Sequence, residues 1–139
     1  MTALGRIRLA RRVIGCYVTV RLLLARHPLP DVVEILAERG RPSNTPIEVT
    51  RLRRAVDRLL VSPGRALKCL PRALVFYSML VEEGHDARIA IGLPEVSSSI
   101  DAHAWVEVDG VDVGPSPGRD GHVPIVRYPV VGSEEGPRD

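Results

Sequence analysis

The sequence lacks several features that would place it in a broad class at once. It has only two cysteines, Cys16 and Cys69, in dissimilar surroundings, so we expect no disulfide framework and a reducing, cytoplasmic location. Its longest uncharged apolar stretch, Val13 to Val20, is far shorter than the ~20 residues that span a bilayer, and membrane association is not expected. It also has no phosphate-binding glycine loop, adenylation motif or internal repeat. We therefore expect that any ATP-dependent step is carried out by another protein.

The charge balance excludes few further classes of function. The formal net charge is +2, which indicates no polyanionic partner, and no nucleic acid is expected. Arginines nevertheless crowd the first helix-like stretch, at Arg6, Arg8, Arg11, Arg12, Arg21 and Arg26. Such a helix could lie on a membrane surface or bind a partner. The favoured interpretation is that it packs on the domain through a stripe of residues at helical spacing, namely Ile7, Ala10, Ile14, Tyr17 and Val18.

The 139 residues predict one domain over residues 1–131, with a helical front at 1–63 and a catalytic core at 64–131. The tail at 132–139 is expected to be disordered. Pro28 and Pro30 should end the first helix. A short helix capped by Asp31 and a helix from about Pro46 to Val61 are predicted to follow, the short one over Val32–Arg39.

The second half of the chain changes its periodicity. Leu70 to Val81 is apolar almost all round, which predicts a buried central helix with Cys69 at or just before its start. Strands are then predicted over Ala87–Leu93, Ala102–Val108 and Val111–Gly114. Asp109-Gly110 is a strong two-residue hairpin signal between the last two. The sequence therefore predicts an α+β fold: a helical front, then a central helix packed on a small antiparallel sheet.

Cys69 and His103 form the candidate catalytic pair. A thiol at a helix N-terminus faces the positive end of the helix dipole, which favours the thiolate, and His103 opens a predicted strand that could supply a base. Trp105 shares the face of His103, and we expect it to form a wall that contacts substrate. His27, His85 and His122 have no ligand spacing, so no metal is expected. No cofactor is expected either.

The local motifs resemble a known family. Lys-Cys-Leu-Pro-Arg-Ala-Leu carries Cys69, and Ala-His-Ala-Trp-Val-Glu-Val-Asp-Gly carries His103, 34 residues later. Together they resemble the core of the transglutaminase-like, papain-related cysteine enzymes. Within that group they look most like the leader proteases of lasso-peptide biosynthesis, relatives of the C-terminal domain of the microcin J25 processing protein. The resemblance covers roughly Arg65 to Gly114.

This resemblance implies an activity and partners. Cys69 would attack the amide between leader and core of a ribosomally made precursor peptide, and His103 would act as base and then as acid. The implied partners are the precursor, a small leader-recognition protein and an ATP-dependent macrolactam cyclase. Two alternatives stay open: a transglutaminase-like acyl transfer to an amine, and a non-catalytic scaffold that holds precursor and cyclase together.

The residue that orients His103 is not decided by the sequence. A two-residue turn at Asp109-Gly110 would place Asp112 about 13 Å along the strand from the level of His103, at roughly 3.3 Å per residue. That separation is too long for a hydrogen bond. Asp120 could fold back after Pro117-Gly118, or Ser116 or a backbone carbonyl could serve instead. Asp112 and Asp120 therefore both stay candidates for the third member.

Overall fold

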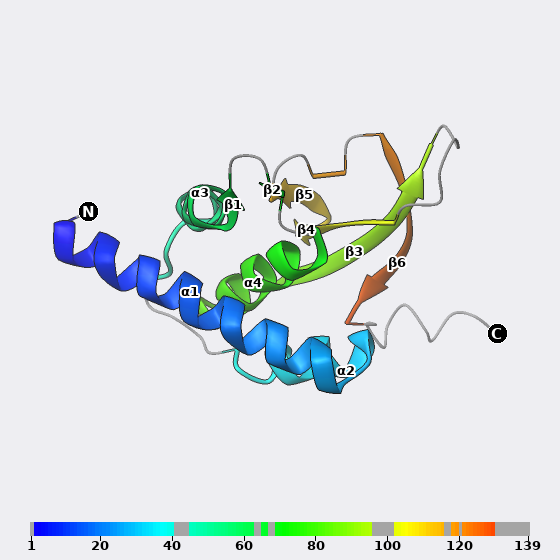
Figure 1. The fold of residues 1–139 in the computed structure, drawn as a ribbon. Helices are drawn as coiled ribbons and strands as arrows, with labels where there is room; N and C mark the ends of the chain where they lie inside the picture. The colour runs from blue at the N-terminus through cyan, green and yellow to red at the C-terminus, as the bar shows by residue number, and fades with distance from the viewer. Residues whose placement is uncertain are drawn as a thin grey trace.

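A buried helix that begins at Cys69 lies at the centre of the fold (Figure 1). The computed structural model describes residues 2–40, 45–62, 65–66, 69–95, 102–115, 118–119 and 121–129. In it the central helix is α4 (Cys69–Glu82), and every residue from Pro71 to Leu80 is buried. A helix with apolar residues on all sides must be covered on all sides. α4 accordingly packs between the other helices and the sheet, as the sequence predicts.

The sheet is antiparallel and has the strand order β5-β4-β3-β6. Its strands are β3 (Ala87–Pro94), β4 (His103–Val108), β5 (Val111–Gly114) and β6 (His122–Tyr128). Ile89, Ala104 and Val106 belong to the apolar core shared with α4. Asp109 and Gly110 both have positive φ, 53° and 80°, as a type I′ turn requires. The turn pairs Val108 with Val111 and Glu107 with Asp112, which confirms the predicted hairpin.

The helical front contains α1 (Ala3–Arg26), α2 (Leu29–Ala37) and α3 (Val49–Leu60). Two predicted boundaries are wrong. Pro28 is the N-cap of α2, and Asp31 lies in the first turn of α2 instead of capping it. A helix start tolerates proline because the first backbone N–H groups have no partner within the helix. α3 begins at Val49, and after Leu60 the chain forms a short hairpin of β1 (Val61–Ser62) and β2 (Arg65–Ala66).

The predicted inner face of α1 is also wrong. Ile7, Ile14 and Val18 are 55%, 54% and 51% exposed. The face that packs on α4 carries Leu9, Val13, Cys16 and Val20 instead. Both sets recur at spacings of three or four residues, so α1 has two apolar stripes on opposite sides, and periodicity alone does not say which one is buried.

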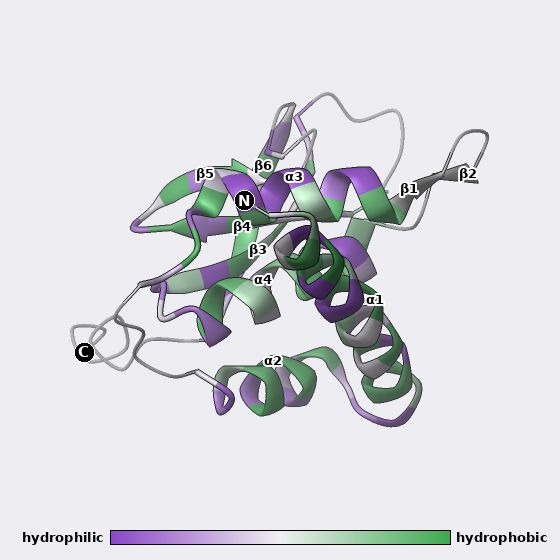
Figure 2. Ribbon diagram, turned by 90° about the vertical axis from the view of Figure 1, so that its left-hand side faces the viewer, coloured by the Kyte–Doolittle hydropathy of each residue, from purple (hydrophilic) through white to green (hydrophobic). Residues whose placement is uncertain are grey.

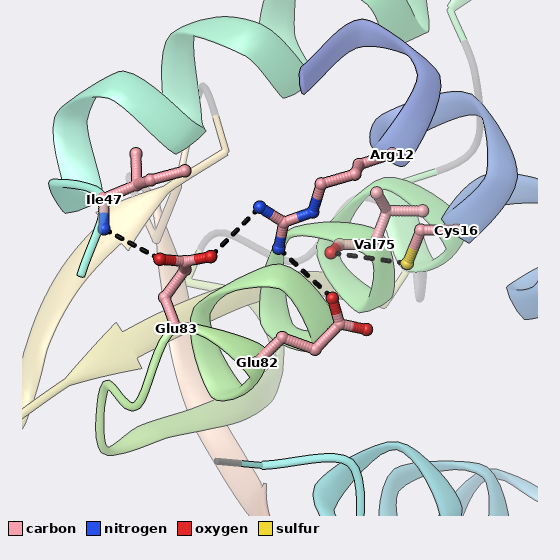
Figure 3. Close-up of polar contacts among 6 residues, drawn as sticks. All are labelled: Arg12, Cys16, Ile47, Val75, Glu82 and Glu83. Carbon is pink, nitrogen blue, oxygen red and sulfur yellow. Dashed lines mark hydrogen bonds and ion pairs between the residues drawn. The ribbon is translucent and has the colours of Figure 1, made fainter. Parts of the chain in front are cut away.

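Ion pairs fix which side of α1 faces the core (Figure 3). Arg12 donates to Glu82 at 3.2 Å and to Glu83 at 3.0 Å, at the C-terminal end of α4. Glu83 also accepts a hydrogen bond of 2.9 Å from the backbone N–H of Ile47, just before α3. Beside this network the Cys16 thiol lies 3.9 Å from the carbonyl oxygen of Val75. Arg12 thus joins α1 to α4, and Glu83 joins α4 to the start of α3.

Strand β6 was not predicted, because the chain after Pro115 is rich in proline and glycine. β6 contains Pro124, and its only neighbour in the sheet is β3. An edge strand tolerates proline since its outer N–H groups need no partner strand. The strand lies inside the predicted 64–131 core. The predicted tail at 132–139 lies outside the described residues.

Candidate functional site

Cys69 is the first residue of α4, as the sequence predicts. Its side chain is half-buried, and its thiol donates to the carbonyl oxygen of Ala102 at 3.9 Å. Ala102 directly precedes His103, the first residue of β4. The start of the central helix and the start of the central strand therefore meet, and they bring the thiol to the backbone that carries the imidazole.

The ring of His103 is held in one tautomer. Its Nε2 lies 2.7 Å from the carbonyl oxygen of Gly118. A carbonyl can only accept, so Nε2 carries the hydrogen and donates it. In the neutral ring Nδ1 then keeps a free lone pair, which is the form that a general base needs.

The surroundings of His103 favour this neutral form. Burial lowers the pKa of the imidazole below its ordinary value of 6.5, and the nearby His122 and Arg72 lower it further, while the Gly118 carbonyl and Asp112 oppose the change. The rings of His103 and His122 are close, with centroids 4.7 Å apart. These surroundings therefore favour the neutral imidazole over the imidazolium.

Asp112 supports the turn that faces the imidazole. Its carboxylate accepts hydrogen bonds from the backbone N–H groups of Gly114 at 2.9 Å and Arg119 at 2.8 Å. Gly118 has a φ of +71°, and a Cβ at this position would lie only 2.5 Å from the Asp112 carboxylate. Among the described residues, the group bound to Nε2 of His103 is thus the Gly118 carbonyl, and the Asp112 carboxylate supports the turn that carries it. Ser116 and Asp120 lie outside the described residues.

Trp105 lies under His103 and is fully buried, with ring centroids 6.0 Å apart. Its indole N–H donates to Glu107 at 3.1 Å, and Arg127 binds the same carboxylate at 2.7 Å. Burial would raise the pKa of Glu107, but the hydrogen bonds from Arg127 and Trp105 outweigh it and hold that pKa below its ordinary value. Trp105 is therefore a fixed floor beneath the imidazole, and its contact with substrate stays a prediction.

Two residues near the pair were not assigned a role from the sequence: Gly118, which supplies the carbonyl, and His122, which lies beside the ring. For Arg72, one turn into α4, the sequence leaves open whether it pairs with a carboxylate or contacts substrate. In the structure its guanidinium lies 3.5 Å from the Asp57 carboxylate. No sequence signal indicated Gly118 or His122, because both depend on how the chain returns along β6.

The residues that the structure describes contain no group of three His, Cys, Asp or Glu side chains able to hold a metal ion. Nor does any helix among them have the length and apolar character needed to cross a membrane. A family model described as "Transglutaminase-like superfamily" matches residues 14–127. Searches of curated proteins and of solved structures found no match.

Proposed function

Because the chain belongs to the transglutaminase-like superfamily, we propose that it is a cysteine peptidase that removes the leader from a lasso-peptide precursor. One observation carries the catalytic part. The Cys69 thiol begins α4 and lies against the backbone carbonyl of Ala102, the residue before His103, and the His103 ring has its Nε2–H bound to Gly118. A nucleophile beside an oriented base is the arrangement that cysteine catalysis needs.

The chemistry follows from these atoms. Nδ1 of His103 takes the thiol proton, and the sulfur of Cys69 attacks the carbonyl carbon of the leader's last residue. When the C–N bond breaks, the imidazolium gives its proton to the departing amine of the core peptide. Water, deprotonated by His103, then attacks the thioester, and this step releases the leader acid and the free thiol. The Gly118 carbonyl stabilises the imidazolium between these steps.

The choice of substrate rests on motif resemblance. The Cys-Leu-Pro-Arg motif at Cys69 and the Ala-His-Ala-Trp motif at His103 resemble those of lasso-peptide leader proteases. By the same resemblance the partners would be a precursor peptide, a small leader-recognition protein and an ATP-dependent macrolactam cyclase. Genes for these partners beside the gene for this chain would support the substrate assignment.

The test is digestion of the precursor peptide encoded beside the gene for this chain, with its recognition protein present, followed by mass spectrometry. We expect the wild type to release a leader and a core fragment, and Cys69→Ala to release neither. Cys16→Ala is the matched control, because Cys16 is buried against α4, and it should cleave normally. Full cleavage by Cys69→Ala would exclude the peptidase and favour a scaffold.

Acyl transfer to an amine is the second candidate, since a Cys–His pair in a transglutaminase-like chain can pass the acyl group of the thioester to an amine instead of to water. Hydrolysis and transfer share the thioester and differ only in the group that attacks it. Adding a fluorescent primary amine to the same digestion distinguishes them. A leader that carries the amine would indicate a transferase, and a leader with a free carboxylate would indicate a peptidase.

A further inference from the structure

A groove between α1 and α3 has arginines at its rim and aliphatic side chains on its floor. Its volume is about 420 Å³. The rim carries Arg6, Arg51, Arg54 and Arg58, and the floor carries Leu9, Ala10, Ala55 and Leu59. All four arginines are exposed, and Leu59 is an aliphatic side chain that remains 40% exposed. The lining contains no carboxylate.

The arginines of this groove are not held in ion pairs within the described part of the chain, although Glu48, just before α3, lines a smaller hollow with Arg51 and Arg54. Other arginines of the same helices are compensated: Arg12 pairs with Glu82 and Glu83, and Arg53 pairs with Asp57. None of the four rim arginines forms an ion pair among residues 2–40, 45–62 and 69–95. α1 contains no acidic residue, and Asp57 is the only one in α3. Bands of polar and apolar residues alternate along α3 (Figure 2).

We propose that this groove binds an acidic amphipathic peptide segment of another protein. Arginine guanidinium groups bind carboxylates through paired hydrogen bonds. Arg51, Arg54 and Arg58 recur at three and four residues, so they cover about 10 Å along one face of α3 at 1.5 Å per residue. A helix with glutamates at the same spacing matches that row of charges, and a leucine between the glutamates fits the floor.

Two other classes of ligand fit less well. Single-stranded nucleic acid is held by aromatic side chains on which bases stack, and the lining has no aromatic residue. A membrane surface is flat, whereas this site is concave, and of its two leucines Leu59 is 40% exposed and Leu9 only 7%. A peptide uses both the charged rim and the apolar floor.

The groove is separate from the proposed peptidase site. It contains neither Cys69 nor His103, and three of its residues, Arg6, Leu9 and Ala10, precede residue 14, where the family match begins. Its occupation is a binding property that can be measured in a Cys69→Ala protein, so the failure of one proposal does not affect the other.

The experiment measures binding of a fluorescein-labelled helical peptide by anisotropy at 150 mM NaCl. The peptide carries glutamates at every third or fourth position with leucines between them. We expect saturable binding that weakens roughly tenfold or more in Arg54→Glu/Arg58→Glu. The matched control is Arg8→Glu/Arg11→Glu, which makes the same charge change at exposed α1 residues outside the groove and should weaken binding less than about twofold.

Two control peptides test the rim and the floor separately. Replacing every glutamate by glutamine should abolish binding, and replacing every leucine by serine should weaken it about as much as Leu59→Gln does in the protein. Circular dichroism must show that each protein variant is folded. The proposal is overturned if the two double variants bind the peptide equally well, or if the glutamine peptide binds like the parent peptide. It is also overturned if single-stranded DNA or anionic phosphatidylserine vesicles displace the peptide equally from the wild type and from Arg54→Glu/Arg58→Glu.

Discussion

At the residue scale, the two cysteines differ in a way that labelling can measure. Cys69 is half-buried at the start of α4, whereas Cys16 is buried between α1 and α4. Burial raises the pKa of the Cys16 thiol, and the nearby Arg39 and Arg12 offset only part of that rise. The thiolate is the species that iodoacetamide alkylates.

We therefore expect Cys69 to react with iodoacetamide at pH 7 about a hundredfold faster than Cys16. In His103→Ala the rate at Cys69 should fall, because the thiol loses its proton acceptor, while the rate at Cys16 should not change. Peptide mass spectrometry over a time course measures both rates in one sample. Equal rates in the native protein would contradict the placement of Cys69.

Asp112 acts on the imidazole through the turn that it supports. Asn has one carbonyl oxygen, so Asp112→Asn can accept only one of the N–H groups of Gly114 and Arg119, and it removes a charge that raises the pKa of His103. We expect turnover to fall about tenfold, and the acid limb of kcat/KM against pH to move to lower pH.

Asp109→Asn is the matched control for this experiment. Asp109 lies in the same hairpin with a φ of 53°, which asparagine adopts readily, and its profile should match the wild type. An unchanged profile in Asp112→Asn, together with a severe loss in Asp120→Asn, would make Asp120 the orienting residue instead.

The sequence predicted Cys69 and His103 as the catalytic pair and left a backbone carbonyl among several candidates for the group that faces the imidazole. Cys69 and His103 could be predicted because each is marked by its local motif and by the start of a regular element. Which carbonyl binds Nε2 could not be predicted, since it lies in a turn whose path depends on the positive φ of Gly118 and on the Asp112 carboxylate. The predicted pairing of Asp112 with Glu107 is confirmed, and from there the Asp112 carboxylate binds the N–H of Arg119 in the turn that carries Gly118.

At the scale of elements, prediction succeeded where burial was unambiguous. α4 and the Asp109-Gly110 hairpin follow from an apolar run and a turn signal. The inner face of α1 was predicted wrongly because the helix has two apolar stripes. The structure distinguishes them by long-range contacts: Leu9, Val13, Cys16 and Val20 pack in the core, and Arg12 pairs with Glu82 and Glu83. The Arg12 pairs link residues about 70 positions apart in sequence, which no local pattern can indicate.

Gly92 allows β3, β6 and Trp105 to approach one another. A Cβ at Gly92 would collide with the carbonyl oxygen of Val123 and lie 2.8 Å from the Trp105 ring. Gly92→Ala should therefore lower the free energy of unfolding by roughly 1–3 kcal/mol, as overpacking does, and the shift of Trp105 should change its fluorescence.

Gly15→Ala should change the free energy of unfolding in the opposite direction to Gly92→Ala. Gly15 lies within α1, and a Cβ there would meet nothing within 4 Å. Alanine should raise the free energy of unfolding by up to about 1 kcal/mol, because it favours the helix. Urea denaturation measures both variants. A neutral Gly92→Ala would mean that β6 does not lie against β3 as described.

At the scale of the whole molecule, the half-buried His103 and the buried Glu107 link stability to pH in the same direction. The pKa of His103 lies below 6.5 in the folded chain, mainly because of burial. The unfolded chain therefore holds more protons than the folded chain as pH falls from 6.5 to the folded pKa. The pKa of Glu107 also lies below its ordinary 4.5, so its stabilising effect is present above pH 4.5 and is lost as pH falls through the folded value.

We accordingly expect the free energy of unfolding to fall between pH 7 and pH 5, before the carboxylate begins to titrate. Trp105 reports this unfolding well, because it is fully buried beside both groups.

His103→Gln should flatten the curve between pH 7 and pH 5, since glutamine does not titrate, and should leave the loss below pH 4.5 in place. His27→Gln, at an exposed position after α1, is the control and should keep the full slope. Equal slopes in both variants would mean that folding does not depend on the neutral form of His103, and the imidazole would then be more exposed to water than its contacts with Gly118 and Trp105 imply.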